Sequence, residues 1–121
     1  MRAHYSELAR FEREGFDVIV ETTSEDSHPG DCFDDTCYDI GEIVRKINSG
    51  FYDWFILRVR VRLAGIDLAE EYCGGMLYED AREVLTDGTA EDLILDGIAD
   101  ARTKALTLKW AFEKVLDTET V

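Results

Sequence analysis

The sequence is poor in the features that mark several large classes of protein. Its 121 residues hold one proline and two histidines, and 13 Lys and Arg stand against 27 Asp and Glu, for a formal net charge of −14. Because affinity for phosphates needs clustered Lys and Arg, we expect no direct binding to nucleic acid or to an anionic membrane. No apolar run approaches a membrane span. The N-terminus lacks the pattern of a signal peptide, so we expect a cytoplasmic location.

Cysteine is also scarce. Cys32, Cys37 and Cys73 form an odd set in a chain without an export signal, which indicates reduced thiols. His28 shares a loop with the first two, but the spacing lacks the C-x2-C pair that is usual in zinc sites. The carboxylates of the same loop do not alternate around a glycine as calcium ligands do. We therefore predict no metal site and no cofactor.

Catalytic motifs are missing as well. The sequence contains no Gly-x-Ser-x-Gly, no phosphate-binding glycine-rich loop and no HExxH. Gly74-Gly75 lies in a predicted strand rather than before a helix, which argues against a phosphate cradle. The prediction is a non-enzymatic protein. A small metal-dependent enzyme that uses the loop carboxylates Asp26, Asp31, Asp34 and Asp35 is the weaker alternative, because nothing in the sequence selects a catalytic pair.

What the sequence does contain is enough apolar material for one folded domain. It is 45% hydrophobic and 11% aromatic, and its length predicts a single domain over residues 1–121. The order of the local patterns predicts an α+β fold. We expect about three strands in a mainly antiparallel sheet, helices on one face of it, and a long C-terminal helix.

Local patterns in the first half predict, in chain order, a short helix over 5–14, a strand over 16–23, a loop over 24–37 and a helix over 39–48. The first helix is inferred from the helical spacing of Leu8 and Phe11, with Gly15 as its stop. The later helix has Asp39 as its N-cap and Glu42 three residues on, which together make a capping box.

The clearest signal is the alternating stretch over 52–63, which predicts a strand. A tight turn at Ala64-Gly65 leads into a second strand over 66–73, and Gly74-Gly75 is expected to form a bulge. Opposite charges in this hairpin predict its register, with Arg62 facing Asp67 and Arg58 facing Glu71.

One face of this hairpin carries Arg58, Arg60 and Arg62 together with three larger side chains, Tyr52, Trp54 and Ile56. We expect the long helix to cover this face. If the face is open, these side chains form a mixed aromatic–arginine patch of the kind that is common at interface hot spots.

The last helix is predicted over 89–116 with Thr89 as its cap, after a short helix over 79–85. Its apolar residues recur at heptad spacing, and those predicted to form a homodimer interface are Ile98, Ala101, Ala105, Leu108, Phe112 and Val115. Such a helix is about 40 Å long, whereas a domain of this size is about 35 Å across. Part of it should overhang the domain or pack on a partner. In the alternative, the sheet covers the whole apolar stripe within one chain.

Acidic residues gather in two runs, over 14–42 and 83–100, that contain no Lys or Arg. Solubility is one explanation. Imitation of nucleic acid is another, because duplex DNA carries about one charge per 1.7 Å and carboxylates can compete for the same basic channel. In that hypothesis the residues that contact the partner are Glu25, Asp26, Asp31, Asp34, Asp35, Glu91, Asp92 and Asp96.

Two short stretches carry a resemblance: YDWF (52–55), and YCGGMLY (72–78) after an alternating strand and a turn. This arrangement resembles small accessory proteins of bacteriophages and mobile elements, which have an Asp-Trp-Phe triplet and a Tyr-Leu-Gly-Gly stretch. Here Cys73 stands in place of the leucine. The resemblance covers about residues 35–95. It implies an α+β fold and carries over no catalytic residue. Small acidic phage proteins of this kind include inhibitors of host defence, among them anti-CRISPR proteins.

The resemblance and the acidic runs together give the functional expectation. It is a phage-encoded, anti-CRISPR-like inhibitor that binds a host complex with a basic nucleic-acid-binding surface and blocks its channel by DNA mimicry. The alternative is a non-enzymatic adaptor or assembly protein that dimerises through its C-terminal helix, in which case acidity serves only solubility.

Overall fold

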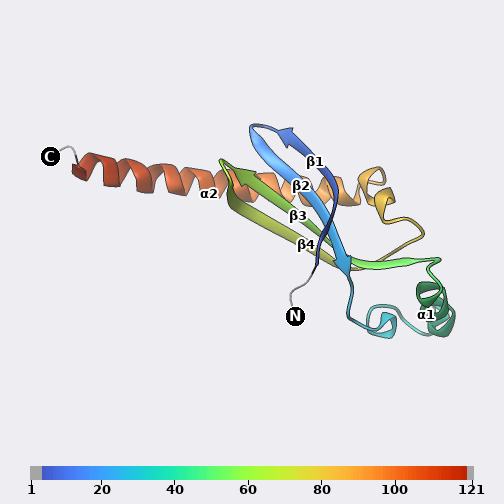
Figure 1. The fold of residues 1–121 in the computed structure, drawn as a ribbon. Coiled ribbons are helices and arrows are strands. Elements are labelled where there is room, and N and C mark those ends of the chain that lie inside the picture. Colours follow the sequence, from blue (N-terminus) through green and yellow to red (C-terminus); the bar gives the residue numbers. More distant parts are fainter. Residues whose placement is uncertain (1–3, 120–121) are drawn as a thin grey trace.

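A computed structural model of the chain describes residues 4–119, and its centre is one open antiparallel sheet (Figure 1). The strands follow each other in space as in sequence: β1 (Ser6–Arg13), β2 (Phe16–Ser24), β3 (Asp53–Leu63) and β4 (Ile66–Tyr78). Helix α1 (Ile40–Asn48) lies at one end of the sheet and α2 (Thr89–Glu119) runs along one face. Two short 3-10 helices complete the described elements, η1 (Pro29–Asp31) and η2 (Ala81–Leu85). The α+β class is confirmed, with four strands instead of about three.

The helix predicted over 5–14 is wrong, because this segment is the edge strand β1. It pairs antiparallel with β2 through a two-residue turn, in which Glu14 and Gly15 both have positive φ, 54° and 88°. The register shifts once next to Leu8, where β1 holds one extra residue. This bulge explains the helix-like spacing of Leu8 and Phe11, since both pack against the core. Gly15 is therefore a turn residue and not a helix stop.

The predicted register of the β3–β4 hairpin is correct at the turn and wrong farther along. Arg62 faces Asp67 as expected, but Arg58 faces Tyr72 and not Glu71. The cause is one extra residue that β4 inserts directly after Asp67. The shift turns Glu71 to the opposite face of the sheet, under α2.

Two predicted helix starts have different outcomes. Asp39 caps α1 as expected, because its carboxylate accepts a hydrogen bond of 3.1 Å from the backbone N–H of Glu42. The cap predicted for the last helix is wrong: Thr89 is already the first helical residue, and its N–H donates to the carboxylate of Asp87 at 2.9 Å. The Thr89 hydroxyl lies 3.0 Å from the hydroxyl of Tyr78 and ties the helix start to the end of β4.

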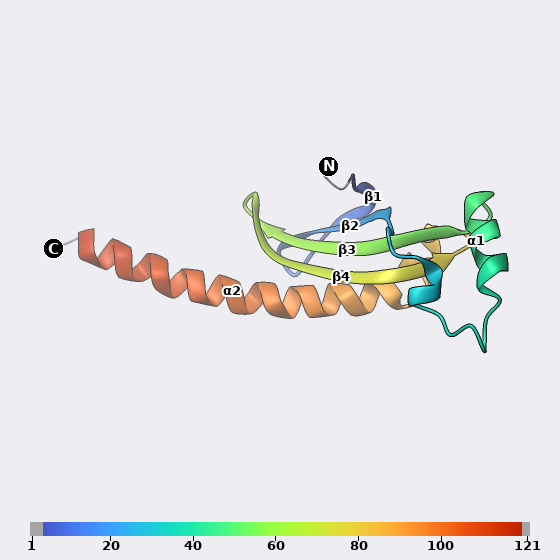
Figure 2. The ribbon, with the colours of Figure 1, turned by 90° about the horizontal axis from the view of Figure 1, so that it is seen from below.

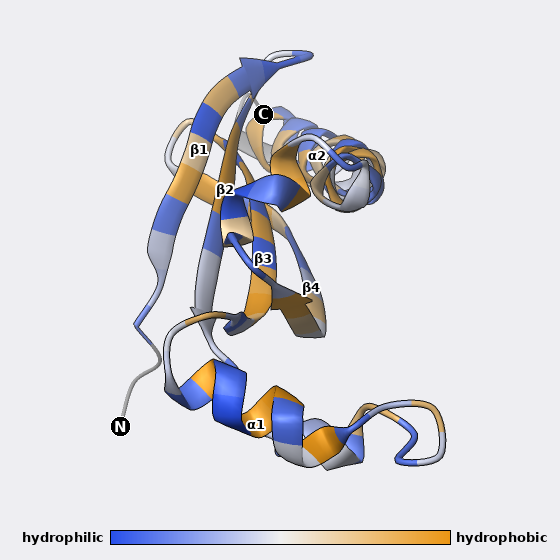
Figure 3. Cartoon of the chain, turned by 90° about the vertical axis from the view of Figure 1, so that its right-hand side faces the viewer, coloured by the Kyte–Doolittle hydropathy of each residue, from blue (hydrophilic) through white to orange (hydrophobic). Residues whose placement is uncertain are grey.

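The hydrophobic core lies between one face of the sheet and the first half of α2. Its buried residues come mainly from β2, β3 and α2: Phe16, Val18, Val20, Phe55, Leu57, Val59, Val61, Val84, Ala90, Ile94, Ile98 and Ala101. Figure 3 shows α2 on this face alone. The expectation that α2 covers the arginine face is therefore wrong. Packing α2 there would have required the desolvation of three guanidinium groups.

Beyond the hairpin turn α2 leaves the sheet (Figure 2). Its 31 residues make a helix of about 46 Å. Ile98 and Ala101 are 3% and 0% exposed, whereas Phe112 and Val115 are 57% and 58% exposed. The predicted overhang is confirmed. The first two residues of the predicted dimer interface, Ile98 and Ala101, lie in the core of their own chain, so the free part of the stripe begins near Ala105.

Candidate acidic binding surface

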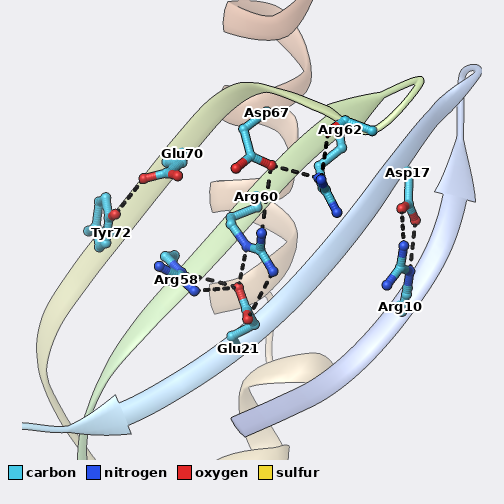
Figure 4. Close-up of polar contacts among 10 residues, drawn as sticks. Arg10, Asp17, Glu21, Arg58, Arg60, Arg62, Asp67, Glu70 and Tyr72 are labelled. Carbon is cyan, nitrogen blue, oxygen red and sulfur yellow. Dashed lines mark hydrogen bonds and ion pairs between the residues drawn. The ribbon is translucent and has the colours of Figure 1, made fainter. Parts of the chain in front are cut away.

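The arginines of β3 are neutralised within the sheet (Figure 4). Glu21 lies between two of them, with its Oε1 at 2.7 Å from Nε of Arg60 and 3.0 Å from Nη2 of Arg58. Nε of Arg62 lies 2.7 Å from Oδ1 of Asp67. Burial alone would raise the pKa of Glu21, but the hydrogen bond from Arg60 and the charge of Arg58 hold this pKa below its ordinary value. This face is therefore no free basic patch.

Aromatic side chains flank these ion pairs. The ring of Tyr5 stacks on Arg58, with 3.5 Å from the guanidinium carbon to the ring centroid. The hydroxyl of Tyr72 donates to Glu70 at 2.6 Å. The aromatic neighbours of Arg58 are therefore Tyr5 and Tyr72, whereas the predicted Trp54 packs against Phe33. The positive charge of this face is already matched by carboxylates of the same chain.

The other described basic residues of the body, defined here as residues 1–100, are also paired with carboxylates of the same chain. It contains 24 Asp and Glu against 9 Lys and Arg, a net charge of −15. Within the described part of the body, every Lys and Arg has an ion pair with a body carboxylate: Arg10, Arg13, Arg45, Lys46, Arg58, Arg60, Arg62 and Arg82. The remaining carboxylates therefore determine the potential at the surface of the body.

The first group of such carboxylates lies on the loop between β2 and α1. Asp26, Asp31, Asp34 and Asp35 are all exposed, and we call them the loop acidic group. Asp34 also shapes the loop, because its Oδ1 accepts hydrogen bonds from the N–H and the hydroxyl of Thr36 at 2.9 and 2.8 Å. These bonds lower the pKa of Asp34, so it stays charged in mildly acidic solution.

Glu25 has a different role from its neighbours. Its Oε1 accepts a hydrogen bond of 2.7 Å from the N–H of Gly75, at the predicted bulge of β4, where Gly75 has a φ of 65°. Close by, the indole N–H of Trp54 donates to the carbonyl of Ser27 at 2.9 Å, and Phe33 stacks on the same indole at 5.8 Å. Glu25 therefore anchors the loop to the sheet, and this anchoring holds the loop acidic group in place.

The second group lies on α2. Asp92, Asp96 and Asp100 are exposed and follow each other at four-residue spacing, about 6 Å apart along the helix axis. Glu71 joins them from β4. A hydrogen bond to Asp100, partial burial, and the charges of Asp100 and Asp96 raise the pKa of Glu71 to about 7. We call these four residues the acidic ridge.

Glu91 points elsewhere. Its carboxylate lies 2.6 Å from a guanidinium nitrogen of Arg13 on β1, so it joins α2 to the edge of the sheet. The structure thus unites Asp92 and Asp96 with two residues that the sequence-based set omitted, Asp100 and Glu71. The spacing of the aspartates was visible in the sequence. Glu71 was not, because only the bulge in β4 turns it toward the helix.

The loop acidic group lies on the loop between β2 and α1, whereas the acidic ridge runs along the first half of α2, over the core face of the sheet (Figure 1). Among the described residues, no hydrogen bond or ion pair joins the loop acidic group to the acidic ridge. They therefore form two separate anionic surfaces, one on the loop before α1 and one on α2 and β4.

Other kinds of site are not formed in the described part of the chain. Across residues 4–119, no three His, Cys, Asp or Glu side chains are arranged to hold a metal ion. Cys32 and Cys37 are exposed free thiols and Cys73 is half-buried. No helix in this range is long and apolar enough to cross a membrane. No protein-family model matches the chain, and neither curated proteins nor solved structures show significant similarity to it.

Proposed function

We propose that the protein is a phage-encoded, non-enzymatic inhibitor of the anti-CRISPR type, which occupies the basic nucleic-acid channel of a host complex. The observation that carries the proposal is the separation of charge: the described basic residues of the body are all used in internal ion pairs, while the loop acidic group and the acidic ridge face solvent. The charged groups that such a body presents to a cationic channel are therefore carboxylates.

The physical basis is competition for one electrostatic site. RNA-guided effectors hold nucleic acid in a positively charged channel and contact its backbone by charge. A body of net charge −15 is drawn to such a channel and excludes the nucleic acid while it is bound. Fixed carboxylates lose little conformational entropy on binding, because the loop is anchored by Glu25 and the ridge lies on a helix.

A competition assay tests the proposal. Purified RNA-guided effector complexes, each with a labelled target duplex, are mixed with the protein, and bound duplex is measured by mobility shift. We expect one effector class to lose its duplex at near-stoichiometric protein and to regain it when salt is raised, since charged contacts are screened over about 8 Å at physiological salt. Inhibition that is unchanged between low and high salt would rule out the electrostatic mechanism.

Three matched sets of substitutions locate the contact surface. Asp92, Asp96 and Asp100 to Asn neutralise three residues of the ridge, and Asp31, Asp34 and Asp35 to Asn neutralise three of the loop. Glu7, Glu12 and Glu79 to Gln remove the same charge from exposed sites elsewhere and serve as the control. We expect at least tenfold weaker inhibition from the ridge or loop set and less than threefold from the control. Equal losses in all three sets would mean that only net charge matters.

A further inference from the structure

An apolar groove lies where α2 leaves the sheet. The tip of the β3–β4 hairpin and the overhanging half of α2 enclose a volume of about 420 Å³, lined chiefly by Leu63, Ile66, Leu68, Leu108, Phe112 and Leu116. Phe112 and Leu116 are 57% and 58% exposed. Large apolar side chains gathered in this way are typical of an interaction site. The groove is separate from both acidic groups.

We propose that the same half of α2 from a second copy of this chain closes the groove, in an antiparallel pair whose twofold axis passes near Phe112. The sheet ends at the Ala64-Gly65 turn, while the apolar stripe of α2 continues past it on the same side of the helix. A second helix would take the place of the sheet over that stretch. Helices pack 8–10 Å apart, close to the spacing of a helix on a sheet.

The exposed area is sufficient for a dimer. The five large residues concerned are 43–58% exposed: Leu63, Ile66, Phe112, Val115 and Leu116. At roughly 150–200 Å² for each residue, they leave on the order of 450 Å² of apolar surface per copy. A symmetric pair would bury nearly twice this area from these residues alone. With its polar rim, the interface reaches the size of about 1,000 Å² that is expected of specific interfaces.

The distribution of charge along the chain favours a second copy as the partner, and an antiparallel pair over a parallel one. Residues 101–121 hold four Lys and Arg against three Asp and Glu, a net charge of +1, while the body carries −15. Two bodies side by side, as in a parallel pair, would repel each other strongly. An antiparallel pair joins the nearly neutral ends and keeps the bodies apart by more than the screening length of about 8 Å.

Sedimentation equilibrium of the full chain at 5–200 µM tests the pairing. We expect a dimer for the wild type and a folded monomer for Phe112→Glu combined with Leu116→Glu, with an unchanged circular dichroism spectrum, because both residues lie outside the core. Leu106→Glu is the control, since Leu106 is 46% exposed but does not line the groove. It should leave the dimer intact. A wild type that is monomeric at 200 µM, or a dimer that survives the double substitution, overturns the proposal.

Spin labels test the direction. With the native cysteines changed to serine, a single label is placed at the exposed Thr103. In the antiparallel pair the two labelled positions are offset by about 27 Å along the helix axis, whereas in a parallel pair they are about 10 Å apart. A short distance between the labels would overturn the antiparallel arrangement. Neither experiment depends on the inhibitor function, because neither involves the acidic groups.

Discussion

Glu71→Gln tests whether the acidic ridge is crowded with like charge. The pKa of Glu71 is raised from 4.5 to about 7, which corresponds to at most roughly 3 kcal/mol in favour of the protonated form. Because the side chain is only partly buried, solvent screening reduces this to about 1–2 kcal/mol. A raised carboxyl pKa means that the folded state binds the proton more tightly than the unfolded state. Its stabilising contribution is therefore complete below pH 4.5 and lost as the pH rises through about 7.

The amide introduced by this substitution cannot ionise but can still donate a hydrogen bond to Asp100. We therefore expect the variant to be more stable than the wild type by about 1–2 kcal/mol at pH 8 and about equal to it at pH 4. Urea denaturation at both pH values measures the difference. Glu70→Gln is the matched control, since Glu70 lies next in sequence but on the opposite face of β4. If both variants gain equally at pH 8, general relief of repulsion and not the ridge explains the effect.

Two further substitutions probe how the sheet and α2 are held together. Glu21→Gln removes the charge between Arg58 and Arg60, and we expect it to lower the free energy of unfolding by about 2–3 kcal/mol at pH 7. This loss should shrink as the pH falls from 4.5 through the lowered pKa of Glu21. A loss that is the same at pH 7 and pH 3 would contradict this expectation. Gly97→Ala should be destabilising by about 1–2 kcal/mol although alanine favours helices, because the new Cβ would lie 3.0 Å from Cγ2 of the fully buried Val61. Thermal melting measures this loss of stability. A stabilised variant would mean that α2 has room to move off the sheet.

Much of the fold was predictable from local sequence. The alternation in β2 and β3, the N-cap at Asp39 and the length of the last helix each reflect a single element, and each is confirmed. The return bond of the predicted capping box is not among the contacts of Glu42, whose carboxylate pairs with Arg45 and Lys46. The charge match at the turn also placed Arg62 opposite Asp67 correctly. These features depend on residues close in sequence, whose preferences the surrounding structure reinforces.

Two of the failures, the helix predicted over 5–14 and the register of β4, share one cause, which is the β-bulge. A single extra residue near Leu8 gave β1 the spacing of a helix. Another after Asp67 reversed the faces of β4, so that Glu71 turned from a partner of Arg58 into a neighbour of Asp100. A bulge has no strong sequence signature outside glycine, and one inserted residue moves every later side chain to the other face. The residue with the most perturbed carboxyl group was for this reason invisible before the structure.

The division of charge along the chain links the two proposals. A body of net charge −15 would oppose any association between copies through the sheet or the acidic ridge, so self-association is left to the part of the chain that carries +1. An antiparallel α2 pair then places the acidic ridges and loop acidic groups of both copies at its far ends, where each can meet a basic surface. Breaking the pair with Phe112→Glu and Leu116→Glu should thus leave the affinity of one body for a cationic channel nearly unchanged. It should lower the apparent affinity only for a target that presents two such channels within reach of one dimer, because only there does binding of the second body become intramolecular.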